Sequence, residues 1–177
     1  GQIQKAVGAS ERVLMILDQQ EEIDPEQYYR PKDKLQLSGD ICFENVHFSY
    51  PTRKDMPVLK GIDFTISCGE KVALVGHSGA GKSTITQLLL RFYNPDEGKL
   101  TVDGQNIKKY DLLEFRKLLG IVPQEIILFG GTIKENILYG RPGSSMQEVR
   151  EAASKANALE FIESFPESFE TKVGERG

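Results

Sequence analysis

The sequence "GHSGAGKS", residues 76–83, gives the strongest indication of the fold, because it has the spacing G-x-x-x-x-G-K-[ST] of a phosphate-binding loop. Glycines let the backbone wrap closely around a phosphate, since no Cβ stands in the way. Successive backbone N–H groups then form an anion-binding nest where the next helix begins. The pattern predicts a nucleoside triphosphate site whose residues are Gly76, His77, Ser78, Gly79, Ala80, Gly81, Lys82, Ser83 and Thr84.

Two residues of this loop have a specific chemical task. Lys82 is placed to reach the β- and γ-phosphates, and the hydroxyl of Ser83 is placed to ligate Mg²⁺. His77 occupies a variable position and is interpreted as a residue of the rim. The alternative, a glycine-rich turn without a ligand, is disfavoured because a short apolar run precedes the loop and a helix with an apolar face follows it.

The segments around the loop alternate between strand and helix patterns. In the first strand apolar and polar residues alternate, but the alternation shifts by one position between Phe43 and Val46, which predicts a bulge or kink there. This order predicts an α/β fold with an appended helical subdomain. The expected strands are 41–50, 61–67, 71–75, 99–104 and 120–124, and the expected helices are 82–93, 110–119, 132–139, 145–157 and 158–165.

The N-terminal part and the composition add limits. Residues 1–19 have apolar residues at helical spacing, and residues 20–40 are polar, contain two prolines and are interpreted as a linker. The net charge of -4 gives no electrostatic argument for nucleic acid as a partner. No run approaches the roughly 18 apolar residues that a membrane span requires.

The stretch from Val46 to Thr84, "VHFSYPTRKDMPVLKGIDFTISCGEKVALVGHSGAGKST", resembles the first half of an exporter-type ABC transporter nucleotide-binding domain. The resemblance implies ATP as the ligand, and it implies that Tyr50 stacks on the adenine; a tyrosine packed in the core at a strand end is the alternative. In "GIVPQEIILF", residues 120–129, it implies that Gln124 ligates Mg²⁺, touches the attacking water and begins a stretch that senses the membrane domain. A solvent-exposed loop glutamine is the alternative there. Lys82 and Gln124 are thereby the expected catalytic residues.

The final residues, "TKVGERG" (171–177), resemble the segment that exporters carry directly before their signature sequence. Glu175 and Arg176 match it, whereas Lys172 replaces an acidic residue. The resemblance implies that this segment contacts the transmembrane domains. It also implies how the chain is divided. Residues 1–19 would be a helix continuing from a transmembrane helix, and residues 20–40 a linker. The β-subdomain with the P-loop NTPase core would follow at 41–124, the start of a helical subdomain at 125–170, and a coupling loop at 171–177.

Three elements that hydrolysis needs in this family have no match: an apolar strand ending in Asp-Glu, the signature L-S-G-G-Q, and a later histidine. "VLMILD" (13–18) and "LSGD" (37–40) imitate the first two, but both precede the phosphate loop and are incomplete. We therefore expect an incomplete domain, part of a longer chain, that binds Mg-ATP, hydrolyses it poorly and is marginally stable alone.

The resemblance implies the ATP-driven motor of an exporter at the cytoplasmic face of a membrane. Its partners would be a second nucleotide-binding domain and transmembrane domains, reached through Gln124, Glu175 and Arg176. Two alternatives remain open: a module that senses ATP without turnover, and a soluble ABC protein acting on nucleic acid or ribosomes, which the exporter-like final segment disfavours. The cargo, and a homodimeric or heteromeric parent, are not determined by these residues.

Overall fold

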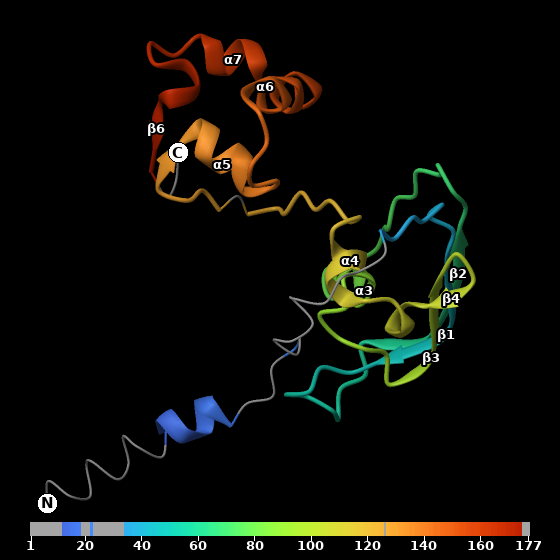
Figure 1. The fold of residues 1–177 in the computed structure, drawn as a ribbon. Coiled ribbons are helices and arrows are strands. Elements are labelled where there is room, and N and C mark those ends of the chain that lie inside the picture. The colour runs from blue at the N-terminus through green and yellow to red at the C-terminus, as the bar shows by residue number, and fades with distance from the viewer. Residues whose placement is uncertain (1–11, 19–21, 23–33, 126, 175–177) are drawn as a thin grey trace, which may run out of the picture. The chain divides into compact units, whose positions relative to one another are not determined.

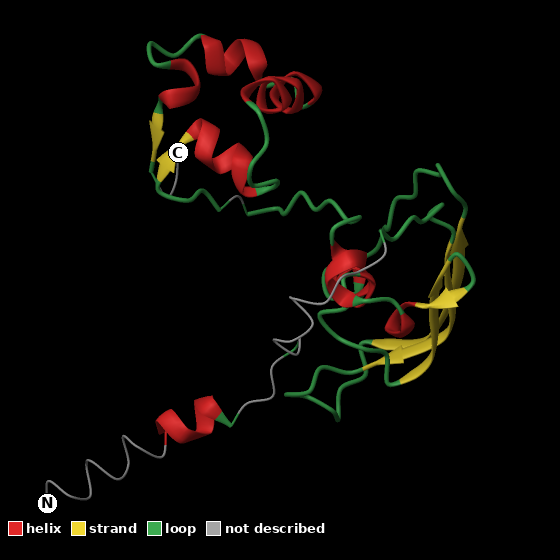
Figure 2. Cartoon of the chain, viewed as in Figure 1, coloured by secondary structure: helices red, strands yellow, loops and turns green. Residues whose placement is uncertain are grey.

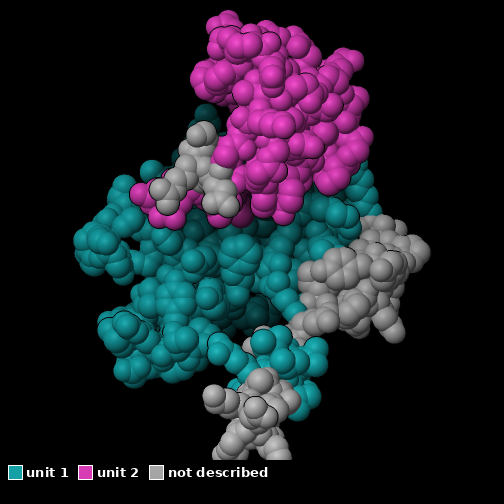
Figure 3. Space-filling view, turned by 90° about the vertical axis from the view of Figure 1, so that its left-hand side faces the viewer, with its two compact units in different colours: residues 1–120 teal, residues 121–177 magenta. Residues whose placement is uncertain are grey.

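A computed structural model describes residues 12–18, 22, 34–125 and 127–174. The chain divides into two units, residues 1–120 and residues 121–177 (Figure 3). Each unit has its own hydrophobic core.

The first unit contains a four-stranded antiparallel sheet in the order β2-β1-β3-β4 (Figures 1 and 2). Its strands are β1 (Ile41–Phe48), β2 (Leu59–Ile66), β3 (Glu97–Val102) and β4 (Gln105–Asn106). The register of β1 against β2 shifts between Phe43 and Val46, which confirms the expected bulge. Asn45 lies inside it with a left-handed backbone, φ 45°.

Two helices, α3 (Lys82–Leu89) and α4 (Leu112–Arg116), lie against the same face of this sheet (Figure 1). A short 3-10 helix, η1 (Ile107–Lys109), precedes α4. Leu88 of α3 and Phe115 of α4 are fully buried against the sheet residues Phe43 and Leu100. Each such side chain contributes about 1.5–3 kcal/mol through removal of apolar surface from water. The phosphate-loop helix is thus fixed by its apolar face.

Two expected strands are wrong. Residues 71–75 and 120–124 have no strand structure, and Val75 and Val122 are 88% and 97% exposed. Both sequences have the apolar character of buried parallel strands, but a strand forms only where a neighbour pairs its backbone N–H and C=O groups. Among the residues that the structure describes, no strand pairs with either segment, and all described pairings are antiparallel.

The helix expected at 82–93 also ends earlier. It stops at Leu89, and Arg91 adopts a left-handed backbone with φ 57°, which no helix can continue through. The helix expected at 110–119 is likewise shortened to α4. Apolar periodicity locates a helix better than it locates its ends.

The second unit is helical, as expected. It contains α5 (Ile133–Tyr139), α6 (Met146–Lys155), α7 (Leu159–Glu163), the 3-10 helix η2 (Ser168–Glu170) and a hairpin of β5 (Gly131–Thr132) with β6 (Lys172–Val173). Helices α5 and α6 both begin with a capping box, Thr132 with Glu135 and Ser145 with Glu148. Such a box satisfies two N-terminal donors of a helix at once.

The two ends of the chain are described only in part. Residues 12–17 are helical, and the remainder of the helix expected at 1–19 lies outside the described residues, as do Glu175 and Arg176. Within the described ranges, no helix has the length and apolar character needed to cross a membrane.

Candidate nucleotide-binding site

The phosphate loop has the backbone that its glycines predict. Gly76, Gly79 and Gly81 all have positive φ, at 152°, 81° and 87°. Gly81 is also the residue that directly precedes α3, and a Cβ on it would lie 2.7 Å from Leu59 Cδ2. Gly81 is therefore required for its left-handed backbone, and a Cβ there would in addition displace the end of the Leu59 side chain.

Lys82 is held by the loop itself. Its Nζ donates to Gly76 O at 2.9 Å and to His77 O at 2.8 Å. Both acceptors are carbonyl oxygens of the segment that would surround a phosphate. To bind a triphosphate, Lys82 therefore exchanges these carbonyl oxygens for phosphate oxygens, with little change in the number of its hydrogen bonds.

The neighbouring loop residues are accessible to a ligand. Ser83 is exposed in the first turn of α3, where its hydroxyl oxygen is of the ligand type that Mg²⁺ prefers. His77 is exposed as well, and its Nδ1 lies 2.8 Å from Ser78 O. The interpretation of His77 as a rim residue stays a prediction.

Tyr50 lies directly beside the loop. Its hydroxyl lies 3.0 Å from Thr84 Oγ1 and donates to Gln87 Oε1 at 2.8 Å. Its ring packs edge-on against Phe48 and Tyr93, with centroids 5.1 and 5.3 Å away. Tyr50 thus has the contacts of the core tyrosine that was the alternative, and its stacking on adenine stays a prediction.

Gln87 was not among the expected site residues. Thr84 and Gln87 are three positions apart in α3, so they share one helix face, and this spacing could have identified the pair. The contact brings the end of β1 and the phosphate-loop helix together at one point.

Asp96 holds the backbone next to Tyr50. Its Oδ2 accepts from Ser49 N at 2.7 Å, and its Oδ1 accepts from Lys54 Nζ at 2.5 Å. The hydrogen bond from Lys54, followed by that from Ser49, lowers the pKa of Asp96 below its usual value. The carboxylate therefore stays ionised at neutral pH and fixes the turn that carries Tyr50. No motif marked this residue.

Variants of Tyr50 separate the stacking role from the core role. Tyr50→Ala is expected to lower ATP affinity by about 5- to 150-fold, because stacking of a base on an aromatic ring is worth about 1–3 kcal/mol. Tyr50→Phe keeps the ring and is expected to bind ATP within about 3-fold of wild type, while it loses thermal stability with the two hydrogen bonds. Titration calorimetry and thermal unfolding measure the two effects separately.

The control is Tyr139→Ala, which removes an exposed tyrosine of the second unit. It should leave ATP affinity unchanged. If Tyr50→Ala binds ATP as tightly as this control, Tyr50 is a core residue only.

Gln124 belongs to the second unit and is exposed. The strand that was expected to end at it is absent, as described above. Its amide oxygen is a ligand type that suits Mg²⁺. The roles expected for Gln124 as a magnesium ligand and catalytic residue stay predictions.

Comparison with known proteins gives the family of this chain. Residues 59–174 match the family model described as ABC transporter. The chain is 46% identical to ABC transporter B family member 2 of Dictyostelium discoideum, covering 97% of this chain and 12% of that protein. It is 44% identical to ABC multidrug transporter mdr2 of Aspergillus fumigatus, covering 99% of this chain and 22% of that protein.

A solved structure gives the same answer for the fold. A bacterial Atm1-family ABC exporter with ATP bound superposes with a TM-score of 0.81 at 40% identity, over 98% of this chain and 30% of the exporter chain. The chain thus has the fold of a P-loop ATPase domain. It belongs to the ABC transporter family, and it spans less than a third of the length of these relatives.

Proposed function

We propose that this chain is the nucleotide-binding domain of an ABC exporter and that it binds Mg-ATP. The observation that carries the proposal is the phosphate loop, with three left-handed glycines leading into α3 and Lys82 at the first helical position. Membership of the ABC transporter family supports ATP as the nucleotide.

Each site residue has a role in this proposal. Lys82 binds the β- and γ-phosphates, and the backbone from Gly76 to Thr84 surrounds them. Ser83 and Gln124 supply oxygen ligands to Mg²⁺, whose charge would neutralise the phosphate oxygens. Tyr50 stacks on the adenine after its hydroxyl leaves Thr84 and Gln87.

In the whole protein, binding and hydrolysis of ATP drive export of a substrate across a membrane. Two such domains enclose two ATP molecules, and their closure moves the transmembrane domains, which are contacted near Gln124 and through Glu175 and Arg176. The domain then lies at the cytoplasmic face of the membrane. The relatives support this assignment, since they are named as ABC transporters, a multidrug transporter and an ABC exporter.

The segment itself is expected to bind ATP without efficient turnover. Its sequence offers no apolar strand ending in Asp-Glu, no complete signature and no later histidine that could complete the site. Without a carboxylate that orients water, the phosphate loop stabilises bound ATP but does not activate the nucleophile.

Direct binding tests the proposal. Titration of the 177-residue chain with ATP is expected to show saturable binding that Mg²⁺ strengthens. AMP should bind much more weakly, because the loop binds the β- and γ-phosphates, which AMP lacks. Release of inorganic phosphate should stay near the rate in a blank. Equal binding of AMP and ATP would contradict the assignment of the loop, and rapid phosphate release would contradict the expected lack of turnover.

A further inference from the structure

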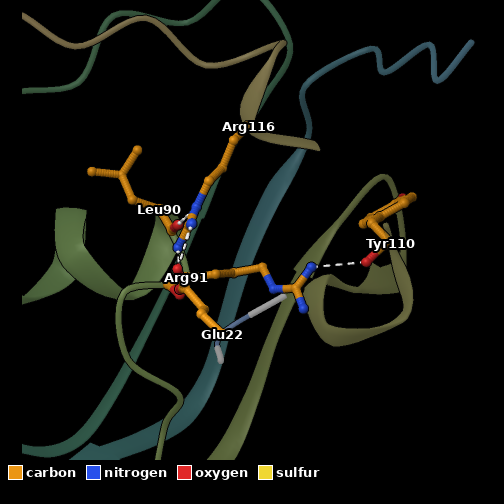
Figure 4. A network of polar contacts seen from close by, with 5 residues as sticks. All are labelled: Glu22, Leu90, Arg91, Tyr110 and Arg116. Carbon is orange, nitrogen blue, oxygen red and sulfur yellow. Dashed lines mark hydrogen bonds and ion pairs between the residues drawn. The ribbon is translucent and has the colours of Figure 1, made fainter. Parts of the chain in front are cut away.

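The guanidinium of Arg116 caps the C-terminal end of α3 (Figure 4). Its Nε donates to Leu90 O and its Nη2 donates to Arg91 O, both at 3.0 Å. The last carbonyl groups of a helix have no partner within the helix, and a cation beside them is favourable. Since α3 begins at Lys82 and has eight residues, Arg116 acts on the end opposite the phosphate loop, about 12 Å away.

Glu22, 94 residues earlier in the chain, binds the same guanidinium through both carboxylate oxygens. Arg116 Nη1 donates to Glu22 Oε2 at 3.0 Å, and Nη2 donates to Glu22 Oε1 at 2.6 Å. This two-pronged geometry is the specific form of an arginine–carboxylate contact. The hydrogen bonds from Arg116 lower the pKa of Glu22, so the pair is ionic at neutral pH.

Glu22 also balances a second cation. Arg91 donates from Nη1 to Tyr110 O at 2.8 Å. Burial lowers the pKa of Arg91, the nearby Arg116 lowers it further, and Glu22 opposes both effects. Asp111 opposes them as well, so Glu22 and Asp111 together offset the charge of Arg91. Glu22 in addition binds Arg116. Loss of Glu22 would strengthen the net repulsion between Arg91 and Arg116.

A second contact joins the residues before β1 to the sheet, at residues 38–40. The carboxylate of Asp103, in the turn between β3 and β4, accepts from the backbone N–H groups of Ser38, Gly39 and Asp40 at 2.7, 2.9 and 2.9 Å. The "LSGD" sequence is thus a turn that binds a carboxylate. Residues interpreted as a linker are fixed near both ends, and the attachment at Glu22 is the one nearer to the N-terminus.

The Glu22–Arg116 pair is partly open to solvent, with side-chain exposures of 54% and 24%. Exposed ion pairs contribute only about 0–1 kcal/mol to stability. The pair is therefore suited to open and close at low cost, rather than to hold the fold together.

We infer that the Glu22–Arg116 pair is a positioning contact that couples the N-terminal segment to the phosphate-loop helix. The buried face of α3 holds the helix in place, and the pair acts on its C-terminal end, so that nucleotide binding and attachment of Glu22 favour each other. The inference rests on the proposed function. Coupling of this kind is reciprocal: ATP strengthens the contact by the same factor by which the contact strengthens ATP binding.

The test uses the full 177-residue chain and its variants Glu22→Gln, Arg116→Gln and the double variant. Glu22→Gln is expected to lower Mg-ATP affinity by about 2- to 5-fold, the range that an exposed ion pair allows. Arg116→Gln should lower it more, because the cap on α3 is lost as well. In the double variant the loss should be smaller than the product of the two single losses, since most of the effect of Glu22 passes through Arg116 and only its weaker interaction with Arg91 remains.

Hydrogen exchange supplies a readout that a purely structural role would not change. Mg-ATP is expected to slow amide exchange in the peptide that contains residues 12–22 of the wild-type chain, and to lose this effect in Glu22→Gln. The matched control is Glu170→Gln, which breaks the ion pair of Glu170 with Lys134 in the second unit at 3.1 Å. It should change neither ATP affinity nor exchange.

The outcomes separate this inference from the function on which it rests. Equal ATP affinity in wild type and Glu22→Gln, or N-terminal exchange that Mg-ATP does not alter, overturns the coupling alone. A wild-type chain that does not bind ATP overturns the proposed function, and the coupling with it.

Discussion

Replacing Lys82 with alanine is expected to lower the affinity for Mg-ATP by roughly 100-fold. A hydrogen bond to a charged group is worth about 1.5–3 kcal/mol, and Lys82 is positioned to make such contacts with two phosphates. The loss stays below the sum of two contacts, because Lys82 gives up hydrogen bonds to Gly76 O and His77 O when ATP binds. Calorimetric titration measures the difference.

Lys71→Ala is the matched control for Lys82→Ala. Lys71 is exposed and lies before the loop, so its replacement changes the net charge equally without removing a proposed phosphate ligand. Lys71→Ala should bind ATP within about 2-fold of wild type, since an exposed, screened charge contributes little at distance. If both variants bind ATP alike, Lys82 is not a phosphate ligand. The proposed function adds one expectation: Lys82→Ala in the longer protein should abolish ATP-driven transport.

Gly98→Ala is expected to destabilise the first unit by about 2–5 kcal/mol. Gly98 lies in β3 with φ 83°, and a Cβ there would lie 2.2 Å from Asn45 O and 2.4 Å from Glu44 O. Both atoms are backbone, so the bulge of β1 and the strand β3 would have to separate. A left-handed backbone costs an alanine about 1–2 kcal/mol, and overpacking adds about 1–3 kcal/mol.

Gly104→Ala isolates the steric part of this effect. Gly104 has a similar φ of 73°, but no atom lies within 4 Å of the position of its Cβ. It should lose only the backbone contribution of about 1–2 kcal/mol. Thermal unfolding followed by circular dichroism compares the two variants. If Gly98→Ala is no less stable than Gly104→Ala, β3 does not lie as close to the bulge of β1 as the structure shows.

The features that the sequence predicted well are those encoded by neighbouring residues. The loop from Gly76 to Ser83 was evident because its chemistry needs fixed residues at fixed spacing. The bulge near Asn45 was evident from a change of parity within a few residues, and the helices of the second unit from their periodicity.

The features that were missed depend on partners distant in the chain. The apolar run 71–75 predicted a strand, but a strand also needs a neighbour, which a single segment cannot encode. Glu22 and Arg116 are both ordinary charged residues in the sequence, and only the fold brings them together. For Tyr50 the sequence offered a core position as the alternative to stacking, but its partners Thr84 and Gln87 lie 34 and 37 residues later and were not predicted.

The bulge in β1 has a consequence for biosynthesis. β1 lies between β2 and β3, and β3 follows only after the phosphate loop and α3. While the chain emerges from the ribosome, β1 can therefore pair with β2 before β3 has been made. The edge of β1 that later pairs with β3 is open during this time, and an unpaired edge can recruit strands of other nascent chains. The left-handed Asn45 interrupts the regular spacing of that edge. The irregularity that admits Gly98 is of the kind by which natural strands disfavour edge-to-edge pairing.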